Sequence, residues 1–365
     1  MGFKCGIVGL PNVGKSTIFN AITNAGAEAA NYPFCTIEPN VGMVNVPDPR
    51  MDKLVEVYHP RSVVPAVTQF VDIAGLVKGA SQGEGLGNQF LTHIRECEAI
   101  MEVVRCFEDE NVVHVHGSVD PLRDVEIIET ELLLKDLDSV EKRLSNEAKL
   151  ARTGGAGAKA RYEACKALRD KMAEGAAARK LLGMSEDGDA IISDLSLLTA
   201  KPIFYCANVG EDEMLTGNEH VAALTKYAAE HGSAVVMICG KIEEELSAME
   251  PAEKADFLHE LGMSESGLDA VVRKGYEILG LKTFFTAGEK EVRAWTFHSG
   301  WKAPACAGVI HTDFERGFIR AETLSYSDFE KYGSWNAAKE AGLVRTEGKD
   351  YLVQDGDIMY YLFNV

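Results

Sequence analysis

The sequence has few features of a secreted, membrane-spanning or zinc-binding protein. Its eight cysteines form no Cys-x-x-Cys pair and no Cys/His cluster with zinc-ligand spacing. No run approaches the roughly 20 apolar residues that a bilayer span requires, and the N-terminal residues lack the pattern of a signal peptide. We therefore expect reduced cysteines in the protein core, a cytoplasmic location and no membrane partner.

Positive charge is also scarce. The 365 residues include 37 Lys plus Arg and 56 Asp plus Glu, for a formal net charge of -19. Non-specific nucleic-acid binding depends on cations that displace counterions from phosphates, so this total excludes general coating of nucleic acid. Residues 141–182 differ, because they carry eleven basic and five acidic side chains. At physiological salt the Debye length is about 8 Å, so this basic region can contact RNA at one place.

The chain is long enough for two or three domains of roughly 100–200 residues each. Short apolar runs alternate with amphipathic, helix-like segments, which predicts an α/β P-loop domain with a mainly parallel sheet. The apolar runs are residues 4–10, 63–73, 99–107, 202–207 and 234–239.

Two regions interrupt this alternation. Between residues 125 and 182, apolar positions recur every three to five residues on both sides of a glycine-rich break, which predicts an antiparallel helical hairpin. Residues 284–298 and 309–319 are rich in aromatic and β-branched side chains, and they predict a small β-rich module. The expected domains are a discontinuous nucleotidase domain (1–124 and 196–279), an inserted helical coiled-coil domain (125–195) and a C-terminal domain (280–365).

The strongest motif is GLPNVGKST at residues 9–17, which fits the phosphate-binding pattern GxxxxGK[ST] between an apolar run and an amphipathic helix. In such loops, backbone N–H groups and the helix N-terminus hold the α- and β-phosphates. Lys15 is expected to reach the β- and γ-phosphates, and Ser16 to offer its hydroxyl to Mg²⁺. The predicted nucleotide-binding residues of this loop are Asn12, Val13, Gly14, Lys15, Ser16 and Thr17.

Two later motifs complete a switch-type site. The segment Asp72-Ile-Ala-Gly75 follows an apolar run, which places the Asp72 carboxylate near Mg²⁺ and the Gly75 N–H near the γ-phosphate. Thr36 is a candidate Mg²⁺ ligand when a γ-phosphate is present, and a plain surface loop is the alternative. The glycine-rich residues 79–87 are predicted to be a switch loop.

Base recognition is predicted at Asn208-Val-Gly-Glu211, where a guanine-specific GTPase has Asn-Lys-x-Asp. The lysine is absent and Glu211 is one methylene longer than aspartate. Loss of the buried bidentate contact to guanine would remove roughly 1–3 kcal/mol of base discrimination or more. The Asn208 amide can accept from an adenine amino group or donate to a ring nitrogen. Guanine preference is therefore not expected, although this segment being merely a turn is the alternative. Backbone groups of residues 237–242 are expected to contact the base.

Taken together, these segments resemble the Obg-related, YchF-type P-loop nucleotidases over essentially the whole chain. The resemblance lies in GLPNVGKST, NYPFCTIEPN and DIAGLVKGASQGEGLGNQFL, in the helical insertion, and in a C-terminal module similar to a TGS domain with a ubiquitin-like β-grasp fold. It implies an Mg²⁺-dependent hydrolase that prefers ATP to GTP and associates with ribosomal particles. It also implies that residues 12–17 bind the phosphates and that Ser16 and Thr36 hold Mg²⁺.

Hydrolysis requires a group that orients the attacking water. Many GTPases use a glutamine after the DxxG glycine, but Leu76 stands at that position. The resemblance implies that a histidine after the run 99–107 takes this role. His114 is the first candidate and His116 its rival, and the alternative is that both lie on a solvated loop. Asn12 further suggests a K⁺ ion that substitutes for an arginine finger.

Three functions fit these observations. The leading one is an ATPase switch with slow intrinsic turnover, in which Lys15 and His114 are the catalytic candidates. The second is a nucleotide-gated module that binds the ribosome, its large subunit or RNA through the basic hairpin (142–180) and the TGS-like domain, with incidental turnover. The third is a guanine-specific GTPase, which Glu211 disfavours. We expect a monomer.

Overall fold

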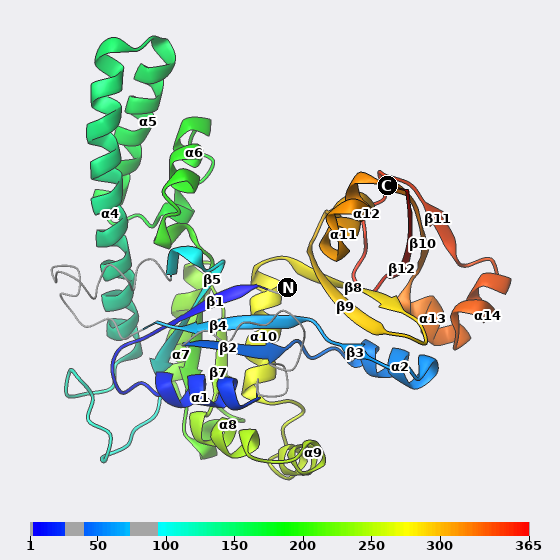
Figure 1. The fold of residues 1–365 in the computed structure, drawn as a ribbon. Coiled ribbons are helices and arrows are strands. Elements are labelled where there is room, and N and C mark those ends of the chain that lie inside the picture. The colour runs from blue at the N-terminus through cyan, green and yellow to red at the C-terminus, as the bar shows by residue number, and fades with distance from the viewer. Residues whose placement is uncertain (1–2, 26–39, 74–93, 365) are drawn as a thin grey trace.

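The computed structural model describes residues 3–25, 40–73 and 94–364, which are organised around two sheets (Figure 1). The first sheet has the strand order β2-β4-β1-β5-β6-β7, and all neighbours pair in parallel except β2 with β4. The mainly parallel sheet predicted from the sequence is thus confirmed. Its strands are β1 (Lys4–Val8), β2 (Val41–Asn45), β4 (Val67–Asp72), β5 (Ala99–Arg105), β6 (Ile203–Asn208) and β7 (Val235–Ile238).

Helices cover this sheet. Every residue of β5 and β6 is buried, as is typical of central strands that carry helices on both faces. The helix α1 packs against α8, and α7 packs against α4. The helices of this part are α1 (Lys15–Ala25), α7 (Glu219–Glu230), α8 (Gly240–Ser247), α9 (Pro251–Glu260) and α10 (Gly267–Ile278).

The predicted helical hairpin is present and projects from the sheet (Figure 1). It consists of α4 (Pro121–Thr153) and α5 (Ala156–Ala173), which pack against each other and are joined at Gly154 and Gly155. A buried apolar cluster that includes Val140 and Leu168 holds the two helices and α6 (Glu186–Asp194) together. Two short 3₁₀ turns, η3 (Ala178–Lys180) and η4 (Leu198–Ala200), lead back to the sheet.

The second sheet is C-terminal and has the order β11-β10-β12-β8-β9-β3. The hairpin of β8 and β9 is antiparallel, and the last strand, β12, lies parallel to β8, as in a β-grasp fold. Its strands are β3 (Val63–Val64), β8 (Leu281–Ala287), β9 (Val292–His298), β10 (Phe318–Leu324), β11 (Arg345–Glu347) and β12 (Ile358–Phe363). Its helices are α11 (Ala303–Ile310), α12 (Thr312–Arg316), α13 (Tyr326–Tyr332) and α14 (Trp335–Glu340).

The expectation of β-structure over residues 309–319 was wrong for most of that segment. Helices α11 and α12 occupy it, and strand β10 begins only at Phe318. The helical start is favoured by a proline in the first turn of α11, and burial of Cys306 and Ala307 in the apolar cluster beside the sheet stabilises that helix. Tertiary packing therefore overrides the local β-propensity.

An N-terminal segment joins the C-terminal sheet. The helix α2 (Pro49–Tyr58) packs against β9, and β3 pairs with the same strand. Arg50 on α2 contacts Asp355 at 2.7 Å, which links the segment to the C-terminal part. The division of the chain into domains stays a prediction. The segment with α2 and β3 lies within the expected nucleotidase domain (1–124), but it packs with residues of the expected C-terminal domain (280–365).

Two further observations concern the described residues. None of their helices has the length and apolar character needed to cross a membrane. The seven cysteines among them are free thiols and all are buried, as expected for core residues.

Candidate nucleotide-binding site

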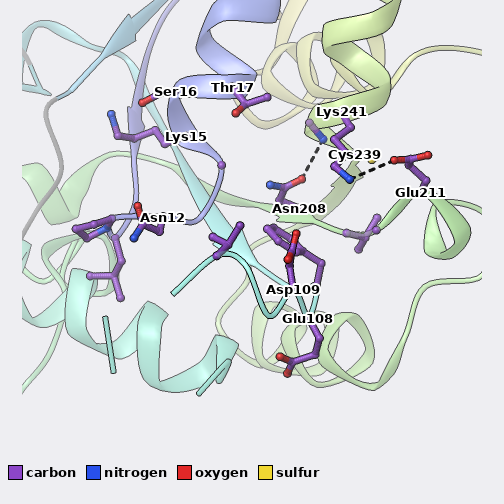
Figure 2. Close-up of a pocket in the computed structure, with 18 residues that line it drawn as sticks. Asn12, Lys15, Ser16, Thr17, Glu108, Asp109, Asn208, Glu211, Cys239 and Lys241 are labelled. Atoms are coloured by element: carbon purple, nitrogen blue, oxygen red, sulfur yellow. Dashed lines mark hydrogen bonds and ion pairs between the residues drawn. The ribbon is translucent and has the colours of Figure 1, made fainter. Parts of the chain in front are cut away.

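A cleft of about 770 Å³ opens at the carboxyl ends of β1, β5 and β6, where ligands bind in open parallel sheets (Figure 2). Its volume is within the range of ordinary ligand sites. Four segments line it: residues 10–12 and 14–17, residues 107–109 with Val112, residues 208–211, and residues 239–241. The predicted P-loop and the predicted base-recognition motif therefore face one cavity.

The P-loop turn depends on two glycines. A Cβ atom at Gly9 would lie 2.7 Å from the carbonyl oxygen of Val103. Gly14 has a φ of 92°, a conformation that side chains other than glycine rarely adopt, and a Cβ there would collide with the Asn208 amide. These close approaches allow the loop to turn tightly into α1, whose N-terminus faces the cleft.

Lys15 and Asp72 lie together in a direct ion pair, and both side chains are mostly buried. Asp72 ends β4, which is paired with β1. The exposed Ser16 stands beside Lys15 at the start of α1. A hydroxyl and a carboxylate are the hard oxygen donors that Mg²⁺ prefers, so these two residues fit the ion. The predictions for Thr36, Gly75, Leu76 and residues 79–87 fall outside the described residues.

Asn208 ties three parts of the cleft together. Its buried side chain donates a hydrogen bond of 2.9 Å to the carbonyl of Val13 and accepts one of 3.0 Å from the N–H of Gly240. Figure 2 shows the amide between the P-loop and the start of α8. These bonds use one N–H and one lone pair, so one N–H and one lone pair of the amide remain available to another partner.

Glu211 and Lys241 form an exposed ion pair of 3.5 Å at the end of the cleft where base recognition is predicted (Figure 2). Glu211 begins the 3₁₀ turn η5 (Glu211–Glu213), and Lys241 lies in the first turn of α8. Only backbone contacts were predicted for residues 237–242, so the Lys241 side chain was not among the predicted site residues. The available signal was a lysine two residues after the end of an apolar run.

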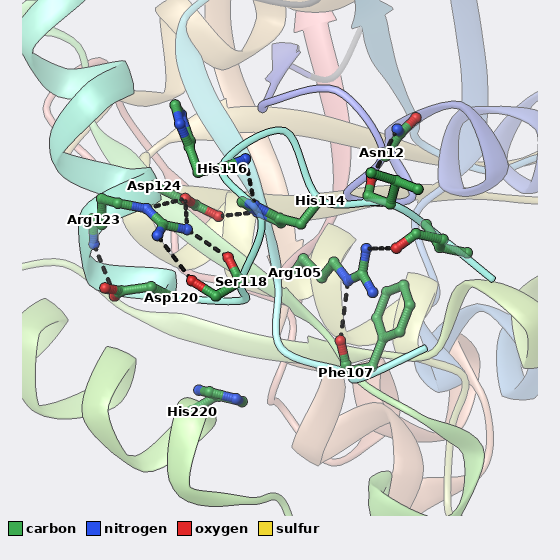
Figure 3. A network of polar contacts seen from close by, with 12 residues as sticks. Asn12, Arg105, Phe107, His114, His116, Ser118, Asp120, Arg123, Asp124 and His220 are labelled. Carbon is green, nitrogen blue, oxygen red and sulfur yellow. Dashed lines mark hydrogen bonds and ion pairs between the residues drawn. The ribbon is translucent and has the colours of Figure 1, made fainter. Parts of the chain in front are cut away.

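Arg105, at the end of β5, organises the loop that follows and was also missed. Its buried guanidinium donates hydrogen bonds to the carbonyls of Phe107, Asp109 and Val112 at 3.0, 3.2 and 2.8 Å (Figure 3). A charged residue at the end of an otherwise apolar strand was the signal for this role. Arg105 therefore shapes the wall of the cleft that residues 107–112 form.

His114 lies on the same loop, outside the described residues that line the cleft. Its side chain is 3% exposed, and its Nε2 lies 2.8 Å from the carboxylate of Asp124 in the first turn of α4. Its Nδ1 accepts a hydrogen bond of 3.1 Å from the N–H of His116, whose side chain is exposed. The solvated-loop alternative therefore does not hold for His114 (Figure 3).

A buried carboxyl group lies near this pair. Burial, together with the negative charges of Glu129 and Asp124, raises the pKa of Glu102 on β5 well above its usual range. This shift favours the neutral form of Glu102, and that form adds no negative charge beside Asp124. Asp124 keeps His114 and Arg123 as its partners.

Comparisons with known proteins place the chain in a family. Residues 4–141 match a family model described as a 50S ribosome-binding GTPase, and residues 281–364 match the YchF-GTPase_C model, described as a protein of unknown function (DUF933). The ribosome-binding ATPase YchF of Bacillus subtilis (strain 168) is 54% identical, over all of both chains. The chain belongs to the YchF family.

Other YchF relatives agree over the full length. The ribosome-binding ATPase YchF of Escherichia coli O157:H7 is 54% identical over all of both chains. A solved structure of the Schizosaccharomyces pombe YchF GTPase is 41% identical, superimposes with a TM-score of 0.87, and is matched over 99% of this chain and 98% of its own. The chain is therefore a P-loop nucleoside triphosphatase with the YchF fold.

Proposed function

We propose that this YchF-family protein is an Mg²⁺-dependent ATPase that prefers ATP to GTP, binds ribosomes and acts as a conformational switch. The observation that carries the proposal is the composition of the cleft. A phosphate end built from the P-loop, Lys15 and Asp72 faces a base end that has Asn208, Glu211 and Lys241 in place of Asn-Lys-x-Asp.

At the phosphate end, backbone N–H groups of residues 12–17 and the N-terminus of α1 hold the phosphates. Lys15 exchanges Asp72 for the β- and γ-phosphates, which frees the Asp72 carboxylate to face the metal. Ser16, Asp72 and Thr36 are the residues that would hold Mg²⁺, which when bound supplies neutralisation of phosphate charge. The N–H of Gly75 is assigned to the γ-phosphate.

At the base end, the remaining lone pair of Asn208 accepts a hydrogen bond from the amino group of adenine. Glu211 is paired with Lys241, so its carboxylate is partly neutralised before a base arrives. That pairing weakens a contact to the guanine N1–H and 2-amino groups further. ATP preference therefore follows from both the length of Glu211 and its partner.

In hydrolysis, water attacks the γ-phosphorus, the bond to the β–γ bridging oxygen breaks, and ADP, phosphate and a proton are released. We assign orientation of this water to His114. In the described structure His114 is held by Asp124, which supports slow intrinsic turnover.

Ribosome binding is assigned to the basic hairpin and the C-terminal β-grasp part. Salt bridges occupy five hairpin cations, namely Arg143, Arg161, Arg169, Lys171 and Arg179. Six others are exposed and form no salt bridge with any described residue: Lys142, Lys149, Arg152, Lys159, Lys166 and Lys180. These six cations are the ones available to RNA phosphates.

Base preference is tested by steady-state turnover with ATP and GTP at equal concentration, with K⁺ or Na⁺ as the monovalent cation. We expect ATP to be preferred in both salts. A GTP preference above tenfold would contradict the base assignment. A higher rate in K⁺ than in Na⁺ is the result expected if Asn12 recruits a K⁺ ion, and equal rates would remove that assignment.

Ribosome binding is tested by sedimentation with ribosomes over a salt series. Reversal of three unpaired cations (Lys149, Lys159 and Lys166 to Glu) should weaken association and flatten its salt dependence. A control variant reverses two salt-bridged cations, Arg169 and Lys171, and should lose less association per reversed charge. No association of the wild type at low salt would contradict ribosome binding. Equal association of the triple variant and the wild type would remove the hairpin from the proposal.

The buried position of His114 also favours a second candidate, a nucleotide-gated ribosome-binding module with incidental turnover. Turnover of the wild type and of His114→Ala, with and without ribosomes, separates the two functions. The ATPase switch predicts that ribosomes raise the wild-type rate and that the substitution removes this rise. Ribosome binding with turnover that neither change affects supports the second candidate.

A further inference from the structure

The imidazole of His114 has both nitrogens engaged in the described structure. A backbone N–H can only donate, so the bond from His116 requires Nδ1 to be an acceptor. The proton of the neutral ring therefore lies on Nε2, which donates to the Asp124 carboxylate at 2.8 Å. A water molecule would find neither a free lone pair nor a free N–H on this ring.

Burial also keeps the His114 ring from contact with water. The side chains of His114 and Asp124 are 3% and 4% exposed, and the loop faces the cleft with Phe107, Glu108, Asp109 and Val112 instead. Figure 3 shows the His114 ring directed toward the start of α4 and away from Asn12. His114 must leave this position before it can contact a nucleotide or its attacking water.

We propose that Asp124 is a positioning residue that holds His114 in a withdrawn state, and that separation of the two side chains gates hydrolysis. This inference rests on the proposed role of His114 in hydrolysis. It adds Asp124 to the residues proposed to act in hydrolysis. Asp124 lies outside every sequence motif, on the hairpin helix α4.

Asp124 has a second partner that makes this separation feasible. Its Oδ1 atom accepts hydrogen bonds from Nε and Nη2 of Arg123 at 3.3 and 3.2 Å, while Oδ2 faces His114. A buried carboxylate that lost its single partner would be strongly destabilised. Because Arg123 stays bound, Asp124 can release His114 without becoming an unpaired charge.

The position of Asp124 also connects the gate to the hairpin. It lies in the first turn of α4, whose 33 residues span roughly 50 Å from the His114 loop to the hairpin tip. Asp136 anchors the middle of α4 by accepting hydrogen bonds from the N–H groups of Leu198 and Thr199 at 2.8 and 2.7 Å. A partner that displaces the hairpin therefore acts on the helix that carries Asp124, the residue that holds His114.

The test is single-turnover hydrolysis of saturating ATP by the full-length protein. Asp124→Asn replaces a charge-assisted hydrogen bond by a neutral one, and Asp124→Ala removes it. We expect both to raise the hydrolysis rate constant, by up to about tenfold for the alanine variant. Asp120→Asn is the matched control, because Asp120 caps the same helix and asparagine caps equally well. Its rate should equal that of the wild type.

Two additional variants separate the gate from the proposed function. The double variant His114→Ala/Asp124→Ala should hydrolyse ATP as slowly as His114→Ala alone. His114→Ala and both Asp124 variants could instead reduce the hydrolysis rate equally. Asp124 would then be an activating partner of His114, which overturns the proposal that it holds His114 in a withdrawn state. If His114→Ala leaves the rate unchanged, the role of His114 fails, and the gate fails with it.

A spectroscopic measurement keeps the inference testable if a variant folds poorly. Nitrogen-15 NMR of the wild-type histidine side chains distinguishes ring tautomers, and His114 should show the Nε2–H form in the nucleotide-free protein. A predominant Nδ1–H form would contradict the pairing with Asp124 directly. Thermal melting of each variant identifies loss of folding.

Discussion

Asn12 of the P-loop donates a hydrogen bond of 3.0 Å from its side-chain amide to the carbonyl of Val113, which lies 101 positions away in the sequence. The φ of Asn12 is 63°, a left-handed conformation that asparagine tolerates better than most residues. Val113 precedes His114, so a single bond connects the phosphate loop to the loop of the proposed water-orienting residue. Nucleotide binding at the P-loop can therefore influence the position of His114.

We predict that Asn12→Ala loosens the His114 loop. Loss of one hydrogen bond, at about 0.5–1.5 kcal/mol, should accelerate amide exchange over residues 112–117 roughly two- to tenfold. Hydrogen–deuterium exchange followed by mass spectrometry measures this change. Asn20→Ala, at an exposed position of α1, is the control and should leave exchange in this loop unaltered. Equal exchange protection in Asn12→Ala and the wild type would show that the hydrogen bond from Asn12 to Val113 does not stabilise the His114 loop.

Asn208 should contribute to stability as well as to binding. Asn208→Ala leaves the carbonyl of Val13 and the N–H of Gly240 without this partner. The expected loss in the free energy of unfolding is about 1–3 kcal/mol, measured by urea denaturation. Asn146→Ala, at an exposed position on α4, should change it by less than about 0.5 kcal/mol. An Asn208→Ala protein with the wild-type free energy of unfolding would mean that the amide contributes to ligand binding but not to stability.

Shortening Glu211 should shift the base preference toward guanine. Aspartate is the residue that accepts from the guanine N1–H and 2-amino groups, and Glu211→Asp also lengthens the separation from Lys241 beyond its present 3.5 Å. We expect the ratio of ATP to GTP affinity to fall by up to about tenfold in competition binding. Glu219→Asp makes the same chemical change in the first turn of α7 and should leave the ratio constant. An unaltered ratio in Glu211→Asp would remove Glu211 from base recognition.

Glu243 should make stability depend on pH. Burial raises the pKa of its carboxyl to about 7, against opposing hydrogen bonds from the backbone N–H groups of Gly267 and Leu268. Below the unfolded-state pKa of roughly 4.3 the group is protonated in both states. As pH rises from there to about 7, the unfolded chain ionises first, so stability is lost until the folded-state pKa is passed.

Glu243→Gln keeps an acceptor for Gly267 without titrating. The stability difference between this variant and the wild type should therefore grow in favour of the variant between pH 5 and pH 8, to the order of 2–3 kcal/mol. Urea denaturation across this range measures it. Glu244→Gln, at the exposed neighbouring position, should show no such pH dependence. A constant difference for Glu243→Gln would mean that the carboxyl titrates normally.

Local patterns in the sequence predicted much of the fold. The amphipathic helix expected after the P-loop is α1 (Lys15–Ala25), because the P-loop sets its start and its apolar face recurs with helical spacing. The hairpin was predictable for the same reason, since each helix buries one regular stripe. The assignment of residues 309–319 to β-structure failed because packing on the sheet, absent from local spacing, selects the helix there.

The chemistry of the cleft divides in the same way. The P-loop pattern specifies phosphate binding because its residues are contiguous and their roles follow from backbone geometry. The contact of Asn208 with Val13 joins residues 195 positions apart, and no sequence spacing predicts it. Lys241 and Arg105 acquire their places only when separate strands meet at one edge of the sheet.

Composition and motifs alone therefore identified an acidic P-loop nucleotidase with a basic hairpin, and they predicted a weakened guanine site. The buried position of His114, its pairing with Asp124 and the hydrogen bond from Asn12 to Val113 were decided by the tertiary structure. The reason is physical: a motif records which groups the chain carries, whereas hydrogen bonding and burial between distant segments decide which of them are free to act.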